Sequence, residues 1–559
     1  MSLAGTTDTA PSSTPLLSAI AARASYTYAL LTVLCALLFL PGLASIPPTD
    51  RDEARFMQAT KQMLETGDWV HIRFQDEPRN KKPVGIYWLQ AVAVRLFGQD
   101  LTTPWPYRLP SAFAAWIAVL AVARCGRRLI SPEAGLIAGA TLATTFMVVV
   151  ESHIAKTDAA LLACVTVAMT LLAELYIRGK STVVSLGFWA AIGVGILIKG
   201  PLIIFVVGAT IATLAFAHRD RAWMKDLNPL TGIPLVLVIV LPWLIAVSGD
   251  SAQGNFVADS ISQDLLPKLI GGQESHGAPP GTYLAATLLT AWPWSVLAPF
   301  VLVLAWRHRR ITIVRFALAW LIPAWIVFEL VPTKLPHYTL PLYPALALLT
   351  AWALTATQEA RDFPRWVGRG VGLTWRIIFA CVAVALAVGI SLALRRFGDS
   401  SGLAAFAGAT ALVLAGLLVL PGFARTTATS AAAGLAAVGL FFSLALTTLV
   451  LPHLNMLAIA PRLKSVIATP GAEVAIAGFH EPSGVFLLGT RTVLTDAAGA
   501  TAFMLSASDR YAVVPEETLE TVRGAVTAAG RSLAEAGEVV GFNYSRGRWE
   551  RLSVVRVNP

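Results

Sequence analysis

The sequence predicts a polytopic α-helical membrane protein with amphipathic interfacial helices and a small C-terminal α/β domain. The chain of 559 residues is 56% hydrophobic and only 14% charged, whereas soluble proteins carry about 25% charged residues. Its apolar residues gather in runs of about 20, the length that a helix needs to cross a bilayer. The 16 tryptophans and 33 prolines suit membrane helices and their interfaces. An ordinary soluble enzyme is therefore excluded.

The apolar runs define about 13 candidate spans, which form a membrane domain over residues 26–454. Residues 1–25, rich in Ser, Thr and Pro, predict a disordered cytoplasmic tail, and no cleavage site follows to make the first run a removable signal. The first span follows this tail. The others are expected near residues 108–124, 134–150, 158–177, 182–198, 200–217, 229–248, 281–305, 311–331, 338–356, 375–394, 402–421 and 430–451.

The distribution of charge along the chain predicts its orientation. The net charge of +10 gathers largely in short basic loops, which the positive-inside rule places in the cytoplasm. An odd number of spans then puts three segments outside: a loop over residues 47–105, a second loop near 250–280, and the segment 455–559. The charge is therefore an orientation signal and does not indicate a nucleic-acid partner.

The outer loop 47–105 is expected to contain two amphipathic helices that lie on the membrane surface. An apolar stripe follows Thr49, which we expect to cap the first helix, and the stripe ends at Gly67. A second stripe follows Pro83 and ends at Gly98. Because proline favours the first helical position, Lys82 is expected to cap the second helix, where lysine and helix N–H groups would bind an anion.

The segment 455–559 predicts a small α/β domain outside the membrane. It alternates short β-rich runs with one helical stretch, near residues 516–536. The expected strands lie at 473–478, 485–488, 511–514, 538–544 and 551–557. The segment contains no cysteine, so it needs no disulfide in an oxidising compartment.

Ionisable residues gather at the outer ends of the predicted helices. Charges at such positions are costly unless they have a partner or a task. Any one of them could instead cap a helix, extend its charge into water or bind lipid headgroups. Their presence on one face predicts a cavity that opens outward and contains both carboxylates and cations. The residues are Asp52, Glu53, Arg55, Lys82, Glu151, His153, Lys156, Asp158, Lys199, Lys268, His276, Lys334, His337, Tyr338 and Tyr343.

Several enzyme classes lack support. The chain has no phosphate-binding Walker loop, no dinucleotide glycine fingerprint and no nucleophile elbow, so ATP-driven transport, NAD chemistry and serine hydrolysis are disfavoured. No local group of His, Cys, Asp and Glu has a tight metal spacing either.

These residues resemble the C-type glycosyltransferase superfamily, specifically the family of protein O-mannosyltransferases and bacterial lipid A aminoarabinose transferases. The resemblance covers most of the chain and rests on the order of several short motifs. They are Asp52-Glu53-Ala-Arg55 with Gly67-Asp68-Trp69, Lys82-Pro83 with Tyr87-Trp88, Lys156-Thr157-Asp158, Lys199-Gly200, the Gln273 and His276 loop, and Lys334-Leu-Pro-His-Tyr338. The C-terminal outer domain fits the aminoarabinose transferases in particular.

The resemblance implies an inner-membrane enzyme that transfers a sugar from a polyprenyl phosphate on the periplasmic face. It implies that Asp52, Glu53 and Asp158 are the catalytic carboxylates. Cations would bind the donor phosphate and stabilise its developing charge: Arg55, Lys82, Lys199 and Lys268. Substrate contacts are expected from Tyr87, Lys156, His276, Lys334, His337, Tyr338 and Tyr343.

The acceptor decides the role of Asp52 and is expected to be lipid A or another lipopolysaccharide component. A hydroxyl acceptor on a protein or glycan, with a hexose or uronic acid donor, is the alternative and needs a general base. A lipid A phosphate is already ionised, so Asp52 would then hold a reactant in line. A lipid or sugar transporter of the flippase type is the competing class, although no internal repeat supports it. We expect a monomer.

One position departs from the family pattern. Lys81 stands where the aminoarabinose transferases usually have a glutamate that has been associated with a metal. A lysine supplies positive charge in place of a metal ligand, and His276 alone is a poor metal site. We therefore expect no tightly bound metal, while a weakly bound divalent cation stays open. The substitution also weakens the expectation of aminoarabinose, so uronic acid, hexosamine and mannose donors stay open.

Overall fold

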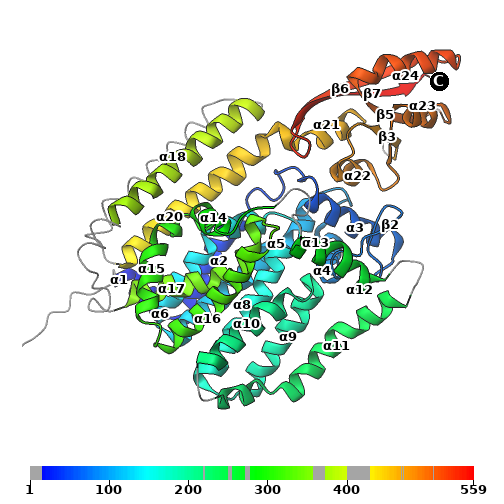
Figure 1. Cartoon of the computed structure of the whole chain (residues 1–559). Helices are drawn as coiled ribbons and strands as arrows, with labels where there is room; N and C mark the ends of the chain where they lie inside the picture. The colour runs from blue at the N-terminus through cyan, green and yellow to red at the C-terminus, as the bar shows by residue number, and fades with distance from the viewer. Residues whose placement is uncertain are drawn as a thin grey trace, which may run out of the picture.

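The computed structural model describes residues 15–217, 221–249, 255–270, 277–356, 372–398, 428–467, 469, 471–507 and 509–558. Its helices form a long bundle, and a small sheet-containing domain sits at one end, which we call the domain end (Figure 1). The predicted span 402–421, His276 and most of the predicted N-terminal tail lie outside the described residues.

Seven helical segments among the described residues are long and apolar enough to cross a membrane. These segments contain α5 (Trp105–Leu129), α8 (Thr157–Arg178), α9 (Thr182–Lys199), η1 with α11 (Ala222–Leu227 and Pro229–Ser248), α16 (Thr312–Leu330), α18 (Gly372–Phe397), and α20 with η9 and η10 (Ala428–Ala445, Leu446–Val450 and Leu451–His453). Shorter helices at the bundle are α1 (Pro15–Ala22), α2 (Ala24–Phe39) and α10 (Leu202–Ala217). The predicted polytopic helical membrane fold is confirmed.

Three of the predicted spans are broken rather than continuous. The segment near 134–150 is a pair of helices, α6 (Pro132–Ala143) and α7 (Phe146–Ser152), bent by 61°. The segment near 281–305 consists of α14 (Thr282–Thr290), η5 (Trp294–Leu297) and α15 (Ala298–Arg307), and the one near 338–356 of η6 (Pro336–Leu342) and α17 (Tyr343–Thr355). Pro293 lies in one break, since proline cannot donate the backbone hydrogen bond of a continuous helix.

The outer loop folds as α3 (Asp52–Thr66), a hairpin of β1 (Arg73–Phe74) and β2 (Glu77–Pro78), and α4 (Gly85–Phe97). The predicted caps are wrong: α3 begins at Asp52 after Arg51, and Val84 rather than Lys82 precedes α4. The first helix ends at Gly67 as expected, with φ 73°. Most side chains of α3 from Glu53 to Met63 are buried within the protein.

The C-terminal domain (residues 459–558) is built on a five-stranded sheet of order β4-β3-β5-β7-β6. Strands β3 (Glu473–Ala477), β4 (Val493–Thr495) and β5 (Arg510–Pro515) are parallel, whereas β6 (Leu533–Asn543) and β7 (Arg548–Val557) add antiparallel pairs. Its helices are α21 (Ile459–Val466), α22 (Pro482–Leu488), α23 (Ala497–Leu505) and α24 (Glu516–Ala528). The predicted strand 485–488 is wrong, because these residues form the end of α22.

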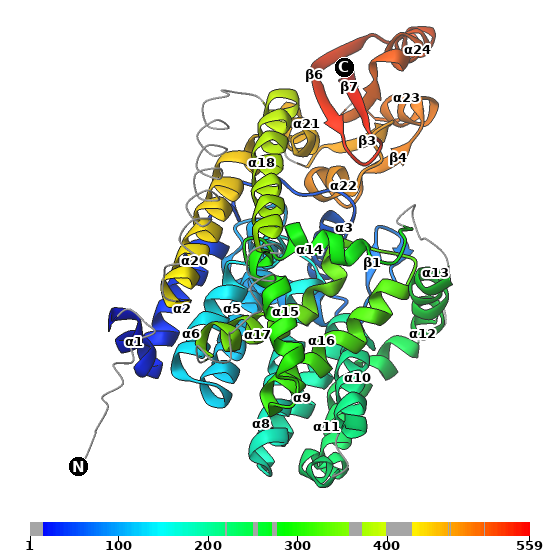
Figure 2. The ribbon, with the colours of Figure 1, turned by 60° about the vertical axis from the view of Figure 1, so that its left-hand side comes forward.

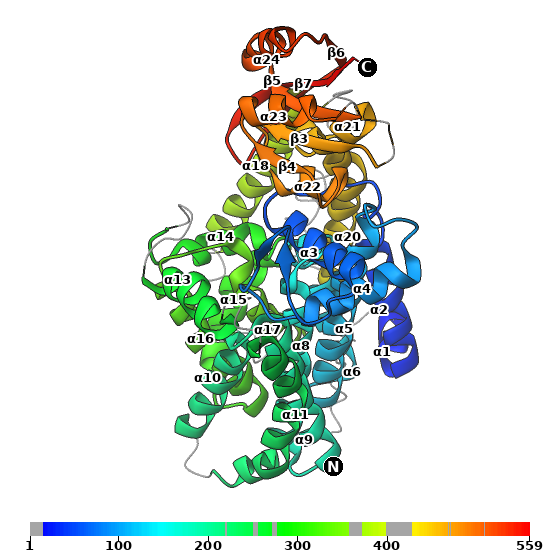
Figure 3. The same cartoon turned by 90° about the vertical axis from the view of Figure 1, so that its right-hand side faces the viewer.

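The C-terminal domain packs directly on α3 (Figure 3). Gln58 donates to the Thr490 hydroxyl over 2.8 Å, and the buried Lys61 ammonium donates to the Phe486 carbonyl over 3.0 Å. On the other side of the molecule, α18 and α20 run side by side towards this domain (Figure 2). There η11 (Asn455–Leu457) leads to α21, and Phe397 at the end of α18 contacts Phe542, with 4.7 Å between ring centroids.

The second outer loop contributes α12 (Phe256–Asp259), η3 (Ser260–Leu265) and α13 (Leu266–Ile270) beside the first loop. Asn80 donates to the Asp259 carboxylate over 2.9 Å, and the Ser260 hydroxyl donates to the Asn80 carbonyl over 2.7 Å. The two outer loops are therefore joined next to the basic segment that contains Lys81 and Lys82.

Candidate active site

Five ionisable side chains meet where four helical elements end. Glu151 lies in α7, Lys156 precedes α8, Asp158 lies in the first turn of α8, Lys199 ends α9, and His337 lies in η6. Sequence positions up to 186 residues apart therefore contribute to one group, which we call the charge cluster. All five side chains lie at or next to the ends of these elements.

Opposite charges alternate within the charge cluster. The Lys199 ammonium lies 2.5 Å from one Asp158 oxygen, and the Lys156 ammonium lies 3.6 Å from the other. Lys156 also contacts Glu151 at 3.0 Å. The His337 ring nitrogens lie 3.7 Å from Glu151 and 3.7 Å from Asp158. Each charge is paired, as burial requires, yet Glu151 Oε2 has no hydrogen-bond partner among the described residues.

The protonation states in the charge cluster follow from burial and neighbouring charges. Burial opposes the charge of Lys156, but Glu151 and Asp158 outweigh it and raise its pKa. Lys156 is consequently cationic.

Asp52 is exposed at the start of α3, and its carboxylate makes no hydrogen bond or ion pair among the described residues. It is nevertheless close enough to Lys156 and to Tyr87 to influence both electrostatically. The predicted catalytic carboxylate thus faces the charge cluster and is accessible to a substrate.

Glu53 has a different environment, and its assignment as a catalytic carboxylate is corrected here. Arg108 binds both of its oxygens, at 2.8 and 3.0 Å, and its side chain has no exposed surface. Thr49 donates its amide and hydroxyl over 2.8 Å each, and the Ala155 amide donates over 2.9 Å. These donors occupy the lone pairs of the carboxylate, so Glu53 is a positioning residue that ties α3 to the bundle.

The predicted phosphate-binding cations of the two outer loops lie on several different elements. Arg55 lies on the first turn of α3, and Lys82 is half-buried before Pro83. Arg79 lies over the Phe56 ring, 5.1 Å from its centroid, and close to the Tyr87 hydroxyl. Lys268 is near enough to His337 to affect its pKa. The predicted phosphate-binding cations therefore come from both outer loops and from α9.

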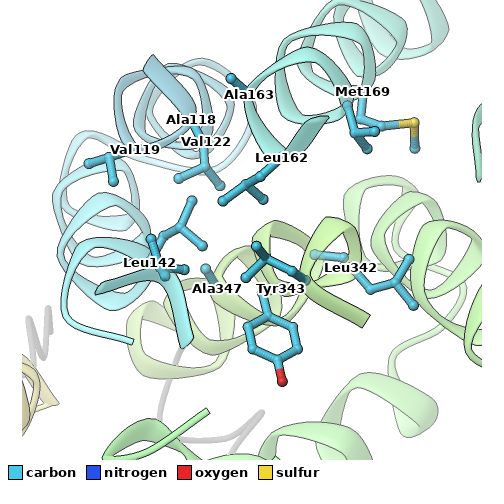
Figure 4. Close-up of a cluster of buried hydrophobic side chains, with 14 of the residues drawn as sticks. Ala118, Val119, Val122, Leu142, Leu162, Ala163, Met169, Leu342, Tyr343 and Ala347 are labelled. Carbon is cyan, nitrogen blue, oxygen red and sulfur yellow. The ribbon is translucent and has the colours of Figure 1, made fainter. Parts of the chain in front are cut away.

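The predicted substrate-binding tyrosines occupy three different environments. Tyr87 is fully buried and packs on Phe56, with 5.3 Å between ring centroids. Tyr338 is partly exposed and holds its ring 5.6 Å from the Lys199 ammonium, at the edge of the charge cluster. Tyr343 lies within the hydrophobic core (Figure 4).

The structure places Tyr343 in the hydrophobic core and not in the charge cluster. Its ring is 2% exposed, and its hydroxyl donates to Thr290 over 2.5 Å. In Figure 4 its backbone lies next to Ala347 and Leu342, and its ring points away from Leu142 and Leu162. Because α17 begins at Tyr343, the helix sets the direction of this side chain towards the core. Tyr343 therefore stabilises the bundle.

Lys334 is buried, and the possible metal ligands can be compared with the described structure. The buried Lys334 ammonium donates to the Val331 carbonyl over 2.5 Å and lies 5.8 Å from the Tyr283 ring, apart from the charge cluster. Within the described ranges no three His, Cys, Asp or Glu side chains are grouped as metal ligands. His276 lies outside the described residues, so the expectation of no tightly bound metal stays a prediction.

Two important residues were not among the predicted site residues. Arg108 is the partner of Glu53, and Arg79 stands beside Tyr87. Glu151 was expected in the outward-opening cavity without a specific role, and the structure makes it the second carboxylate of the charge cluster. Arg108 was read as the start of an apolar span, and only a search for a counter-charge to Glu53 could have found it.

The comparisons with known proteins agree with this architecture. Residues 81–245 match the dolichyl-phosphate-mannose-protein mannosyltransferase family. An undecaprenyl phosphate-alpha-4-amino-4-deoxy-L-arabinose arabinosyl transferase of Pseudomonas paraeruginosa is 29% identical, over 62% of this chain and 62% of that protein. A second, of Pseudomonas fluorescens, is 30% identical, over 57% of this chain and 58% of that protein. The matches thus span about three fifths of the length of these relatives.

Solved structures extend the similarity to nearly the whole chain. ArnT from Cupriavidus metallidurans, in its complex with undecaprenyl phosphate, superposes with a TM-score of 0.73 at 21% identity, covering 95% of this chain and 98% of ArnT. The oligosaccharyltransferase AglB from Archaeoglobus fulgidus gives a TM-score of 0.50 at 12% identity, covering 88% of this chain and 69% of AglB.

The fold matches that of ArnT from Cupriavidus metallidurans and, more distantly, that of AglB. In sequence, the chain is similar to the protein mannosyltransferase family over residues 81–245 and to the curated arabinosyl transferases over about three fifths of its length. The resemblance predicted from the short motifs is confirmed.

Proposed function

We propose that this protein transfers a sugar from a polyprenyl-phosphate donor to lipid A or another lipopolysaccharide component. The observation that carries the proposal is the exposed Asp52 carboxylate, which influences Lys156 of a buried, charge-paired cluster that Lys268 of the second outer loop also approaches. The names of the curated relatives and the undecaprenyl phosphate bound by ArnT support the same donor. In this proposal the domain end faces the periplasm, and the membrane is the bacterial inner membrane.

The reaction needs one bond to form and one to break. An acceptor oxygen attacks the anomeric carbon of the donor, and the bond between that carbon and the phosphate oxygen breaks. The electron pair leaves with the polyprenyl phosphate. Fixed cations stabilise this developing anion because they require no reorganisation during the step. Arg55, Lys82 and Lys268 are proposed for this role, and Lys199 supports it through Asp158.

The role of Asp52 depends on the acceptor. A lipid A phosphate is already ionised, so it reacts without losing a proton, and Asp52 holds a reactant in line. Asp158, Lys156, His337 and Tyr338 are proposed to hold the sugar or the acceptor at the charge cluster, where Glu151 Oε2 offers a further acceptor. We also propose that the protein is a monomer and that it holds no tightly bound metal. Without a required metal, EDTA should leave sugar transfer unchanged.

A protein acceptor is the second candidate, because residues 81–245 match a family of protein mannosyltransferases. In that reaction a Ser or Thr hydroxyl attacks the anomeric carbon, and Asp52 must accept its proton. The same site geometry serves both reactions, so the acceptor has to be identified by experiment.

The test uses purified protein in liposomes with undecaprenyl-phosphate-linked 4-amino-4-deoxy-arabinose, mannose or galacturonate. Lipid A and a Ser/Thr-rich peptide are offered together, and mass spectrometry detects the product. We expect lipid A to gain the mass of one sugar. Mass gained by the peptide alone would favour the second candidate. Donor that crosses the membrane without any covalent product would contradict both and favour a flippase.

A further inference from the structure

The two residues before Asp52 are held by the C-terminal domain. The Tyr544 hydroxyl accepts from the Asp50 amide over 2.5 Å and lies 3.4 Å from the Asp50 carbonyl oxygen. The Asp50 carboxylate accepts from the Ser483 amide over 3.0 Å. Tyr544 follows β6 and Ser483 lies in α22, so two separate elements of the domain hold one peptide of the outer loop.

Arg51 adopts a backbone conformation that arginine rarely takes. Its φ is 69° and its ψ is −105°, directly before the first residue of α3. Such a conformation persists only where the surroundings enforce it. Arg51 donates to the Ser545 carbonyl over 3.3 Å, and its guanidinium lies 3.8 Å from Glu481. The C-terminal domain therefore supplies contacts on both the main chain and the side chain at this turn.

Asp52 lies between two anchors that belong to different domains. On one side, Tyr544 holds the peptide of Asp50. On the other side, Arg108 of the membrane domain holds Glu53. The Asp52 side chain itself makes no hydrogen bond among the described residues, so its position depends on the backbone that these anchors fix.

We propose that Tyr544 is a positioning residue for Asp52, and that the C-terminal domain thereby completes the active site. The proposal rests on the proposed function, in which Asp52 orients or activates a reactant. A shift of about 1 Å in such a group is enough to cost a large factor in rate. Loss of the Tyr544 hydroxyl should therefore lower kcat and leave binding of the donor phosphate, which uses other residues, intact.

The experiment compares Tyr544→Phe with Thr490→Val in the full-length protein. Both changes remove one hydroxyl from the interface between the C-terminal domain and the outer loop. Thr490 accepts from Gln58 over 2.8 Å and donates to Glu65 over 2.6 Å, farther along α3. The Thr490 variant therefore controls for weakened docking without a direct effect on Asp52.

We expect Tyr544→Phe to lower kcat at least tenfold, with the donor KM within twofold of wild type. Thr490→Val should keep kcat within twofold. Equal losses of kcat in both variants would overturn the proposal, because they would indicate docking rather than positioning. An unchanged kcat in Tyr544→Phe would overturn it as well.

Hydrogen exchange separates this proposal from the proposed function. Tyr544→Phe should raise the exchange of the amides of residues 51–55 at least fivefold, whereas Thr490→Val should leave these amides unchanged. If the wild type transfers no sugar, the proposed function fails, and the exchange data still decide whether Tyr544 positions Asp52. Unchanged exchange at residues 51–55 in Tyr544→Phe would overturn the positioning role.

Discussion

Two groups of buried charges lie near each other at the domain end, and they are built differently. In the Glu53–Arg108 pair, every carboxylate oxygen is occupied, and Arg108 also donates to the carbonyls of Leu43, Ile46 and Pro47. The charge cluster shares five ionisable side chains, and Glu151 Oε2 is left without a hydrogen bond among the described residues. A saturated pair fixes the backbone, whereas an unsaturated cluster keeps capacity for a substrate.

The pair and the cluster therefore predict opposite consequences of mutation. Breaking the pair should act mainly on stability, because an unpaired buried charge remains. Breaking the cluster should act mainly on transfer, because the remaining members of the cluster still compensate one another.

The largest effect is expected from Arg108→Met. The change leaves Glu53 buried without its counter-charge, so the free energy of unfolding should fall by about 3–5 kcal/mol. Unfolding in mixed detergent micelles measures this loss. As a control, the double variant Glu53→Gln with Arg108→Met should be less destabilised than the single variant. If the free energy of unfolding of Arg108→Met lay within about 1 kcal/mol of wild type, the structural role of the Glu53–Arg108 pair would be contradicted.

Lys199→Met should have the next largest effect, on transfer rather than on stability. It removes the 2.5 Å contact with Asp158, but Lys156 remains beside that carboxylate at 3.6 Å. We expect kcat/KM to fall about 100-fold, the size of effect that removal of one preorganised electrostatic group produces. A radiolabelled donor measures transfer, and Lys180→Met, which changes an exposed lysine, is the matched control. Equal kinetics in both variants would contradict the role of Lys199.

A pH-dependent effect is expected at the contact between Asp50 and the C-terminal domain. Burial and the nearby Glu481 raise the pKa of Asp50 to about 7, although Ser483 and Arg51 oppose the shift. Between the unfolded pKa of about 3.9 and about 7, the folded state binds more protons. Stability from this group is therefore complete in acid and lost as pH rises towards 7.

The variant Asp50→Asn tests this pH dependence. The melting temperature of the wild type should decline relative to the variant between pH 5 and pH 8. The comparison is measured in detergent at constant ionic strength, and Asp76→Asn at another position in the outer loop serves as the control. Parallel melting curves of wild type and Asp50→Asn over this range would show that the Asp50 contact does not titrate.

Much of the fold could be predicted from the sequence, because the length of an apolar run and the turn at Gly67 are local signals. The breaks within the spans and the helical conformation of α22 do not follow from local signals in the sequence. Residues 485–488 form a short apolar run, which periodicity cannot assign to strand or helix. The helix is selected by Pro482 at its start and by packing on α3.

The sequence predicts which charged residues gather on one face of the bundle, but it does not predict which of them form ion pairs with each other. Nothing local distinguishes Asp52 from Glu53, although one is exposed and the other is enclosed by Arg108, 55 residues away. Tyr343 shows the converse case, because a residue close in sequence to His337 points into the core once a helix begins at it. Pairing across distant helices and side-chain direction require the folded structure.

The central claim is that two adjacent carboxylates have separate tasks, one in chemistry and one in structure. The most direct test measures sugar transfer and melting temperature for Asp52→Asn and Glu53→Gln side by side. We expect the rate of sugar transfer by Asp52→Asn to fall by at least about 100-fold, while its melting temperature stays unchanged. Glu53→Gln should melt at a clearly lower temperature. Wild-type transfer by Asp52→Asn, or wild-type stability of Glu53→Gln, would contradict this claim.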